Sequence, residues 1–271
     1  MFNENQHSAD YNNIIDTPRP SHSDYSAFVR YSSFNDVAGG GHFSGRLTAP
    51  LCFAGAVCMQ ILEGMGVEIQ AHIQKIKNVY DDKIDFVNIG KWDVAKKAFP
   101  VINDEKGKLM IAEIEKAREM GDSVGGVIEC AVTGVKAGFG DPMFDGVENK
   151  LSKNIFGIPA VKGIEFGNGF LACDLYGSEN NDDFCIADGE IRTKTNNSGG
   201  INGGITNGMP IVFRTAIKPT PSVFKEQNSV SLQNKTEEKL QIKGRHDPCI
   251  VQRAVPVVEA VTAITLLDLL I

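Results

Sequence analysis

The feature that most constrains this chain is a nearly uncharged stretch from Arg46 to Met65. Glu63 is the only charged residue between its ends, Pro50 stands near its start, and Gly64 lies near its end. A proline near the start and glycines at the end are typical of a helix, and so apolar a helix needs cover on most of its sides. The chain is therefore expected to fold with sheets or partner subunits around this helix.

The remaining secondary structure is expected to separate helices from runs of strands. Alternation of apolar and polar residues predicts strands at residues 67–76, 124–135, 163–175 and 211–217. Helices are predicted at residues 103–120, 145–156 and 253–270, and loops at residues 182–208 and 223–240. In the first strand, His72 falls on the polar face and is read as incidental, like His7 and His22. This order predicts an α+β fold with antiparallel sheets and no alternating βαβ order.

The N-terminal residues differ from the rest of the chain. Residues 1–27 are polar, contain Pro18 and Pro20, and show no helix or strand period. We therefore interpret them as an extended arm or loop, followed by a single domain over residues 28–271.

Charge and cysteine spacing exclude several classes of function. The formal net charge is −7 and the isoelectric point is near 5.3, which argues against a nucleic-acid binder. The six cysteines form no CxxC pair, so no disulfide framework and no metal site are indicated. No signal peptide and no uncharged run of spanning length are evident, which favours a cytoplasmic protein that does not bind membranes.

Glycines surround a histidine just before the apolar helix. Gly39–Arg46 reads GGGHFSGR, in which His42 and Arg46 add a proton-active group and a charge to a flexible backbone. Such a string can bind an anion or a flat ligand at the start of a helix. The alternative is a plain glycine turn, since the string lacks the features of a dinucleotide fingerprint or a P-loop.

Two further strings carry side chains suited to chemistry. Arg214–Ser222 reads RTAIKPTPS, which presents a lysine and two hydroxyls on a proline-stiffened loop after a strand; an ordinary strand exit is equally compatible. Gly244–Cys249 reads GRHDPC, where an aspartate beside histidine and arginine could tune or relay a proton, or simply cap the last helix.

Together these strings resemble the chorismate synthase family. The four that carry the resemblance, in the family's order, are GGGHFSGR, NGGITNGMP at Asn202–Pro210, RTAIKPTPS and GRHDPC. IPAVKGIEFGNGF at Ile158–Phe170 and AVPVVEA at Ala254–Ala260 join them, and the resemblance runs from about Arg19 to the C-terminus.

The resemblance implies an enzyme that removes phosphate from 5-enolpyruvylshikimate 3-phosphate to give chorismate. Such a carbon–oxygen lyase uses reduced FMN without net redox change. The implied fold is a β-α-β sandwich, with a helical core flanked by antiparallel sheets, and the implied assembly is a homotetramer. Two alternatives remain: a catalytically incomplete remnant that keeps flavin binding or oligomer contacts, and a flavin reductase that consumes NADPH, although no nicotinamide motif is present.

Site residues follow from the same resemblance. The implied catalytic residues are His42 and Asp247. The implied FMN-binding residues are His42, Phe43, Ser44, Pro159, Ala160, Gly203, Lys218, Pro219, Thr220, Pro221, Ser222 and Arg245. A substrate with a phosphate and two carboxylates needs local cations in an acidic protein, and the candidates are Arg46, Arg214, Lys218 and Arg245.

The chain departs from the family pattern upstream. Family members carry a Gly-Glu-Ser-His-Gly motif and several arginines that grip phosphate before the region that this chain matches. We find no counterpart of them here. The fold is therefore expected to persist in part, and activity is expected to be absent or weak in this form.

Overall fold

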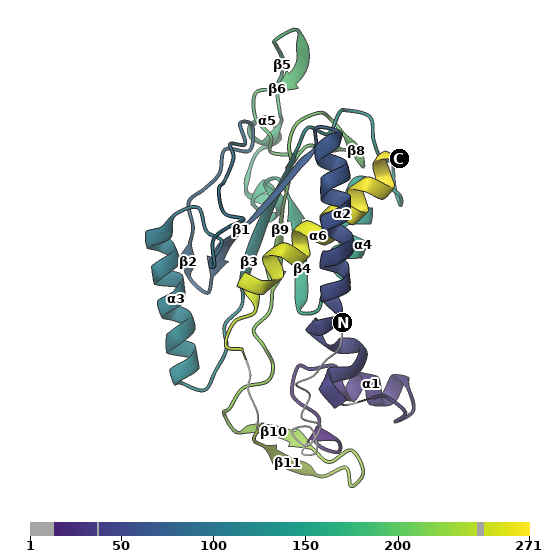
Figure 1. Cartoon of the computed structure of the whole chain (residues 1–271), viewed down its shortest axis with the longest axis vertical. Helices are drawn as coiled ribbons and strands as arrows, with labels where there is room; N and C mark the ends of the chain where they lie inside the picture. Colours follow the sequence, from purple (N-terminus) through teal and green to yellow (C-terminus); the bar gives the residue numbers. More distant parts are fainter. Residues whose placement is uncertain (1–13, 37, 243–246) are drawn as a thin grey trace.

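The computed structural model describes residues 14–36, 38–242 and 247–271, and its central element is a five-stranded antiparallel sheet (Figure 1). The strand order is β2-β1-β3-β9-β4. The strands are β1 (Glu68–Ile76), β2 (Val79–Tyr80), β3 (Gly126–Thr133), β4 (Val161–Phe166) and β9 (Ile211–Ile217). Sequence-distant strands thus lie side by side, as an α+β fold requires, and the predicted fold class is confirmed.

A layer of helices covers one face of this sheet. It contains α2 (Thr48–Gly64), α4 (Val147–Ile155) and α6 (Val251–Leu270). Alternate residues of the strands, such as Ile73, Ile128 and Phe213, point into a core shared with α6. α2 lies so close to α6 that a side chain at Gly55 would overlap Ala260. The amphipathic α3 (Asp104–Glu119) contacts β1 and β2 at the edge of the sheet.

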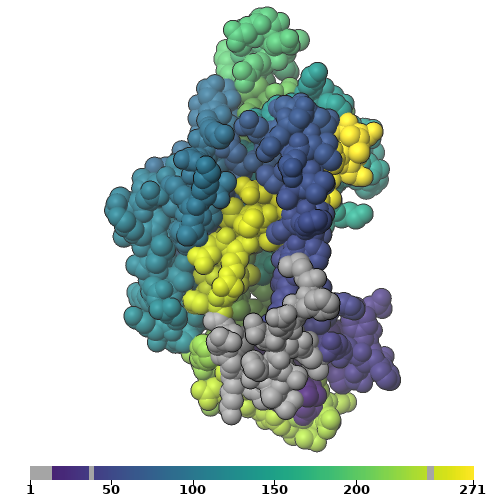
Figure 2. Space-filling model, viewed as in Figure 1, coloured from purple at the N-terminus to yellow at the C-terminus, as the bar shows by residue number. Residues whose placement is uncertain are grey.

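The apolar helix predicted from residue 46 to 65 is present, but much of it is uncovered. A ridge spaced by four residues, Phe53, Val57 and Ile61, is exposed, and Figure 2 shows α2 on the surface beside α6. By length and composition alone, Gly45–Gly64 is apolar enough to cross a membrane, a test that core helices of soluble proteins also pass. The cover expected for this helix is supplied on one side, by α6.

Several loops predicted from composition contain hairpins. Within residues 182–208 lie β5 (Phe184–Ala187) with β6 (Glu190–Thr193), and β7 (Ile201–Asn202) with β8 (Ile205–Thr206). Residues 223–240 contain the hairpin of β10 (Gln227–Val230) and β11 (Glu237–Leu240). Both loop predictions were therefore wrong in part, because backbone pairing overrides the polar, glycine-rich composition. Also unpredicted is the short helix α5 (Gly177–Asn180).

Element ends also differ in two other places. The strand predicted at residues 163–175 ends at Phe166, and a 3-10 helix, η4 (Gly169–Asp174), follows. Gly167 breaks the strand with a φ of +54°, a left-handed conformation that favours glycine. Near the N-terminus, residues 14–23 form loop and turn, and α1 (Asp24–Arg30) begins inside the stretch interpreted as an arm.

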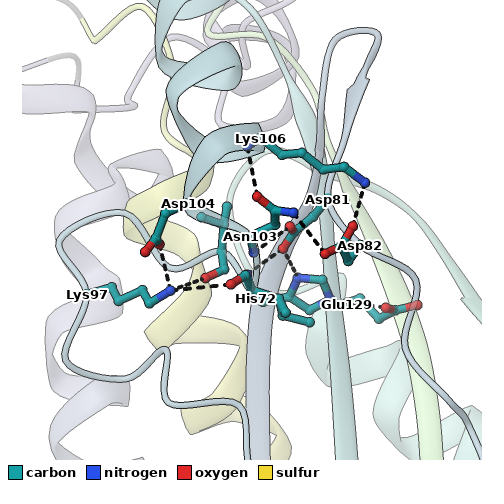
Figure 3. Close-up of polar contacts among 10 residues, drawn as sticks. His72, Asp81, Asp82, Lys97, Asn103, Asp104, Lys106 and Glu129 are labelled. Atoms are coloured by element: carbon teal, nitrogen blue, oxygen red, sulfur yellow. Dashed lines mark hydrogen bonds and ion pairs between the residues drawn. The ribbon is translucent and has the colours of Figure 1, made fainter.

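The other face of the sheet carries a ladder of charged residues. His72, Glu129, Arg214 and Glu165 are consecutive cross-strand neighbours on β1, β3, β9 and β4. His72 Nδ1 lies 2.9 Å from Asp81 Oδ2 and its Nε2 lies 3.1 Å from Glu129 Oε2 (Figure 3). Arg214 Nε lies 3.0 Å from Glu165 Oε1. His72 is therefore buried within an ion-paired network, and reading it as an incidental residue on a polar face was wrong.

The His72 end of the ladder is closed to solvent by the segment after β2. Trp92 lies edge-on to His72, with ring centroids 5.0 Å apart, and packs with Val94 against the same sheet face. Asp81 also accepts backbone hydrogen bonds from Ile102 and Asn103, and Asn103 caps α3. The cluster thus ties the sheet to the start of α3.

Candidate active site

The loop Lys218–Ser222, here called the lysine loop, is the centre of the candidate site. It follows β9 directly, where Pro219 and Pro221 lack the amide hydrogens that would continue the ladder. The backbone amide of Lys218 donates a hydrogen bond to the carbonyl of Ala160 at 2.9 Å. Ala160 has a φ of +72°, an uncommon value for a residue with a side chain. Two segments predicted to contact flavin, residues 159–160 and 218–222, are therefore neighbours.

Residues near the N-terminus meet this loop. Lys218 Nζ donates to the Ser21 carbonyl at 2.5 Å, and Arg19 Nη1 donates to the hydroxyl of Ser222 at 3.2 Å. Both Arg19 and Ser222 are buried. The segment that contains Arg19 thus forms a wall of the candidate site, from a part of the chain that we had interpreted as an extended arm.

That wall contains a compact Arg–His–Asp cluster. Arg19 forms two hydrogen bonds of 2.8 Å with the Asp24 carboxylate, and His22 Nδ1 lies 2.5 Å from Asp24 Oδ1. Burial alone would raise the pKa of Asp24, but hydrogen bonds from Arg19 and His22 outweigh it, and the pKa is lowered. The cluster therefore holds an ionised carboxylate beside an imidazole.

The geometry assigns a proton position on His22. Arg19 Nη2 also approaches His22 Nδ1, at 3.0 Å, but one ring nitrogen cannot both accept from Arg19 and donate to Asp24. The shorter contact, to Asp24, places the proton on Nδ1. All side-chain hydrogen bonds of His22 to the described residues involve Nδ1, which leaves Nε2 available to a ligand. The sequence reading missed this residue, although a histidine two positions before an aspartate, in Arg-Pro-Ser-His-Ser-Asp, was a usable signal.

A cavity of about 860 Å³ borders the cluster. Its walls come from residues 18–22, from Tyr25 and Ser26, and from the hairpin of β10 and β11. Figure 1 shows α1, this hairpin, and the first turns of α2 and α6 toward the same end of the molecule. The lining includes Arg19 and His22 but not Lys218, so the cluster separates the cavity from the lysine loop.

The residues of the loop fit an anionic group. Thr220 Oγ1 is buried and has no hydrogen-bond partner among the described residues. A buried hydroxyl without a partner is uncommon, and a bound water, ion or ligand atom is one explanation for it. Together with Lys218 in the same loop and with Arg19, which bonds to Ser222, this donor set suits the phosphate of FMN or of a phosphorylated substrate.

Asp247 and Pro248, here called the Asp247 corner, lie next to a segment that contacts the lysine loop. Asp247 Oδ2 forms an ion pair of 2.7 Å with Arg253 Nη1, and the Pro248 carbonyl accepts from the amide of Val124 at 2.8 Å. Arg245 lies outside the described residues. The side chain of Asp247 is partly exposed, so a proton-transfer role stays a prediction.

The GGGHFSGR residues lie in short 3-10 helices before α2. They are η2 (Ala38–Phe43) and η3 (Gly45–Leu47), and Ser44 caps the second by accepting from the amide of Arg46. His42, Phe43 and Arg46 are exposed. The described contacts show no bond between them and the lysine loop, and their predicted roles stay predictions.

Two predicted site residues lie elsewhere. Gly203 is in the β7–β8 turn, next to residues 141–147 and near the start of β9, whereas Lys218 follows its end. Seven strand residues separate these ends by roughly 20 Å. Arg214 is engaged by Glu165 and by the Gly167 carbonyl, to which Nη2 donates at 2.6 Å. Within this chain, neither residue joins the cluster around Lys218.

Comparison with known proteins identifies the family of this chain. The sequence model of the chorismate synthase family matches residues 1–271. The chorismate synthase of Korarchaeum cryptofilum is 46% identical over 98% of this chain and 73% of its own length. That of Lancefieldella parvula is 43% identical over 99% of this chain and 74% of its own. A crystal structure of chorismate synthase superposes with a TM-score of 0.73 at 28% identity, covering 90% of this chain and 68% of the other. The resemblance inferred from the sequence is confirmed, and this chain belongs to the chorismate synthase family.

Proposed function

We propose that this chain binds reduced FMN and 5-enolpyruvylshikimate 3-phosphate and contributes to the elimination of phosphate that gives chorismate. The observation that carries the proposal is the convergence of three segments. Ala160, the loop Lys218–Ser222 and the Arg19–Asp24 cluster are joined by hydrogen bonds, and the loop contains the unpartnered hydroxyl of Thr220. Membership of the chorismate synthase family supports the same reaction.

The chain's own residues would bind and position anions. Lys218 and Arg19 supply positive charge that the acidic protein lacks overall, and Thr220 supplies a buried hydroxyl. Phosphate leaves more readily when cations offset its growing negative charge. The His22–Asp24 pair is suited to hold or deliver a proton, because the carboxylate orients the ring and keeps the second nitrogen available.

The cofactor would supply the electronic part of the reaction. Reduced FMN, when bound, offers transient electron donation that weakens the carbon–oxygen bond to the departing phosphate, with no net redox change. In the proposal, residues 159–160 and 218–222 hold it from one side. His42, Phe43, Ser44 and Arg245 remain proposed contacts, and Asp247 a proposed proton-handling residue.

Oligomer formation belongs to the same proposal. Gly203 lies near the end of β9 opposite to Lys218, and in the proposal its flavin contact belongs to the site of another subunit. The exposed ridge of Phe53, Val57 and Ile61 supports subunit contacts, since burying such a surface is favourable. Both observations agree with the proposed homotetramer.

The chain spans part of the length of its relatives, 73% and 74% for the two named above. The proposed roles are therefore those of the region that the chain matches.

The test combines binding with turnover. Isothermal titration with FMN and substrate is expected to show binding of both, and an anaerobic assay with reduced FMN measures chorismate formation and phosphate release. Failure to bind FMN and substrate would refute the proposed function. Anaerobic oxidation of NADPH in the presence of FMN would instead favour the reductase alternative.

A further inference from the structure

The short connection between α3 and β3 lies between two parts of the candidate site. Ser123 Oγ donates a hydrogen bond of 2.7 Å to the Thr220 carbonyl, inside the lysine loop. The next residue, Val124, donates its amide to the Pro248 carbonyl at 2.8 Å, beside Asp247. Two adjacent residues therefore contact two segments that the resemblance assigns to flavin chemistry.

Gly125 brings this connection closer to the lysine loop than any other residue type would allow. A Cβ at position 125 would stand 2.9 Å from the Pro219 nitrogen and 3.0 Å from the Lys218 carbonyl carbon, and closer still to the Ile217 carbonyl oxygen. All three are backbone atoms of the β9 exit, which cannot rotate away as the end of a flexible side chain can. Even one methyl group at this position must therefore displace the start of the loop.

The same connection contacts residues just beyond the lysine loop. The Phe224 amide donates to the Gly121 carbonyl at 2.9 Å, and Lys225 Nζ lies 2.7 Å from Asp122 Oδ2. The ion pair is largely exposed and contributes little stability by itself. Together with the contacts of Ser123 and Gly125, however, these contacts place the connection alongside residues 218–225.

We infer that Ser123 and Gly125 are positioning residues of the candidate site. They fix the loop Lys218–Ser222 relative to the Asp247 corner, without touching a ligand themselves. The inference rests on the proposed function for its effect on flavin, and on the contacts above for its effect on the loop. Since a misplacement of about 1 Å can cost catalysis about 100-fold, the fit of this connection matters for chemistry as well as for stability.

The experiment compares Gly125→Ala with the matched variant Gly90→Ala. A side chain at Gly90 meets no atom within 4 Å, and neither glycine has the positive φ that would strain alanine. We expect Gly125→Ala to weaken FMN binding by about tenfold or more in a fluorescence titration. In the protein without added flavin, amide hydrogen exchange should accelerate in peptides that cover residues 218–225 and 247–251. Gly90→Ala should change neither readout.

A second pair of variants, at Ser123, tests the inference even if Gly125→Ala fails to fold. Ser123→Ala should accelerate exchange in residues 218–225 and weaken FMN binding, and Ser123→Thr, which keeps the hydroxyl, should restore both. Residues that merely stabilise the fold would raise exchange evenly across the sheet, without this local pattern and without rescue by threonine.

The outcomes separate this inference from the proposed function. If the unaltered chain binds no FMN, the proposed function fails, and the exchange data alone decide the inference. Unchanged exchange at residues 218–225 in both Gly125→Ala and Ser123→Ala would overturn it. Accelerated exchange there with unchanged FMN affinity would overturn the positioning role as well, because the loop would then not set the flavin site.

Discussion

Two histidines of this molecule each contact an aspartate, and their surroundings differ. His72 is fully buried, both of its ring nitrogens contact carboxylates, and Trp92 covers it. His22 is partly exposed and forms its described side-chain hydrogen bonds through one ring nitrogen, beside Arg19 and a cavity of about 860 Å³. The first cluster is closed and saturated with partners, whereas the second has a nitrogen and a cavity left for a ligand.

The difference separates a role in folding from a role in binding. A residue whose hydrogen-bonding groups are all engaged inside the protein has none to offer a ligand, however unusual its charge. Perturbed ionisable groups mark functional sites only when they also face a cavity. On this criterion the His72 cluster stabilises the sheet, and the His22 cluster belongs to the candidate site.

The largest effect is expected for His72→Ala. Removal of the imidazole leaves Asp81 and Glu129 buried without their partner, which should lower the free energy of unfolding by about 3–5 kcal/mol. Urea unfolding followed by circular dichroism measures this loss. A loss below about 1 kcal/mol would show that the ladder is not a stabilising element.

Glu259→Gln should stabilise the chain at high pH. Burial raises the pKa of Glu259 to about 7, while the hydrogen bond from the Ala71 amide opposes the rise. A raised carboxyl pKa contributes stability at pH below about 4.5 that is lost as pH rises through 7. The glutamine keeps an acceptor for Ala71 and cannot ionise, so it should add up to about 3 kcal/mol at pH 8 and little at pH 4.5. Equal stability of the two proteins at pH 8 would contradict this.

Trp92 provides an optical test of the state of His72. Burial would lower the pKa of His72, but hydrogen bonds to Asp81 and Glu129 outweigh it, and the pKa is raised. The stability from the charged imidazole is therefore complete below about pH 6.5 and is lost as pH rises through the higher folded pKa. Since the chain has one tryptophan, its fluorescence should change with a midpoint above about pH 6.5.

That titration is best measured in the Glu259→Gln protein, because Glu259 titrates in the same direction near pH 7. Asp81, whose pKa is lowered, loses its contribution only in acid. The fluorescence transition should be absent from His72→Asn. A midpoint below pH 6.5 would show that burial dominates over the two carboxylates.

The smallest change in stability is expected for His22→Ala. Asp24 keeps its two hydrogen bonds with Arg19, so the free energy of unfolding should fall by about 1 kcal/mol or less. Affinity for 5-enolpyruvylshikimate 3-phosphate should fall by about tenfold, measured by calorimetry. If stability falls as far as in His72→Ala while ligand affinity stays unchanged, the two histidines share one structural role.

The sequence predicted those parts of the fold that depend on local periodicity. β9 has the predicted bounds, and the helix predicted at residues 103–120 is present as α3, with Asn103 as its cap. The β10–β11 hairpin escaped prediction because its polar composition resembles that of a loop. The β5–β6 hairpin was within reach of the sequence, since Asp188-Gly189 between the apolar β5 and β6 is a hairpin turn signal, but the Asn- and Gly-rich residues around it hid the pattern.

The candidate site was predictable where a motif carries the chemistry in one string. Lys218 and its prolines form such a string, and the structure joins them to Ala160. Ser123 reaches Thr220 across 97 positions, and Arg19 reaches Ser222 across 203, so neither contact leaves a local pattern. His22 lay within reach of sequence reasoning, since Asp24 is two residues away.

The central claim is that Lys218 and its loop bind the anionic groups of flavin and substrate. The most direct measurement is anaerobic titration of FMN and 5-enolpyruvylshikimate 3-phosphate into three proteins: the unaltered chain, Lys218→Met and Lys108→Met. Lys108 is an exposed lysine in the first half of α3, outside the site. We predict saturable binding that Lys218→Met weakens by about 10- to 100-fold and that Lys108→Met leaves unchanged. Binding that is indifferent to Lys218, or equally sensitive to both lysines, would contradict the account.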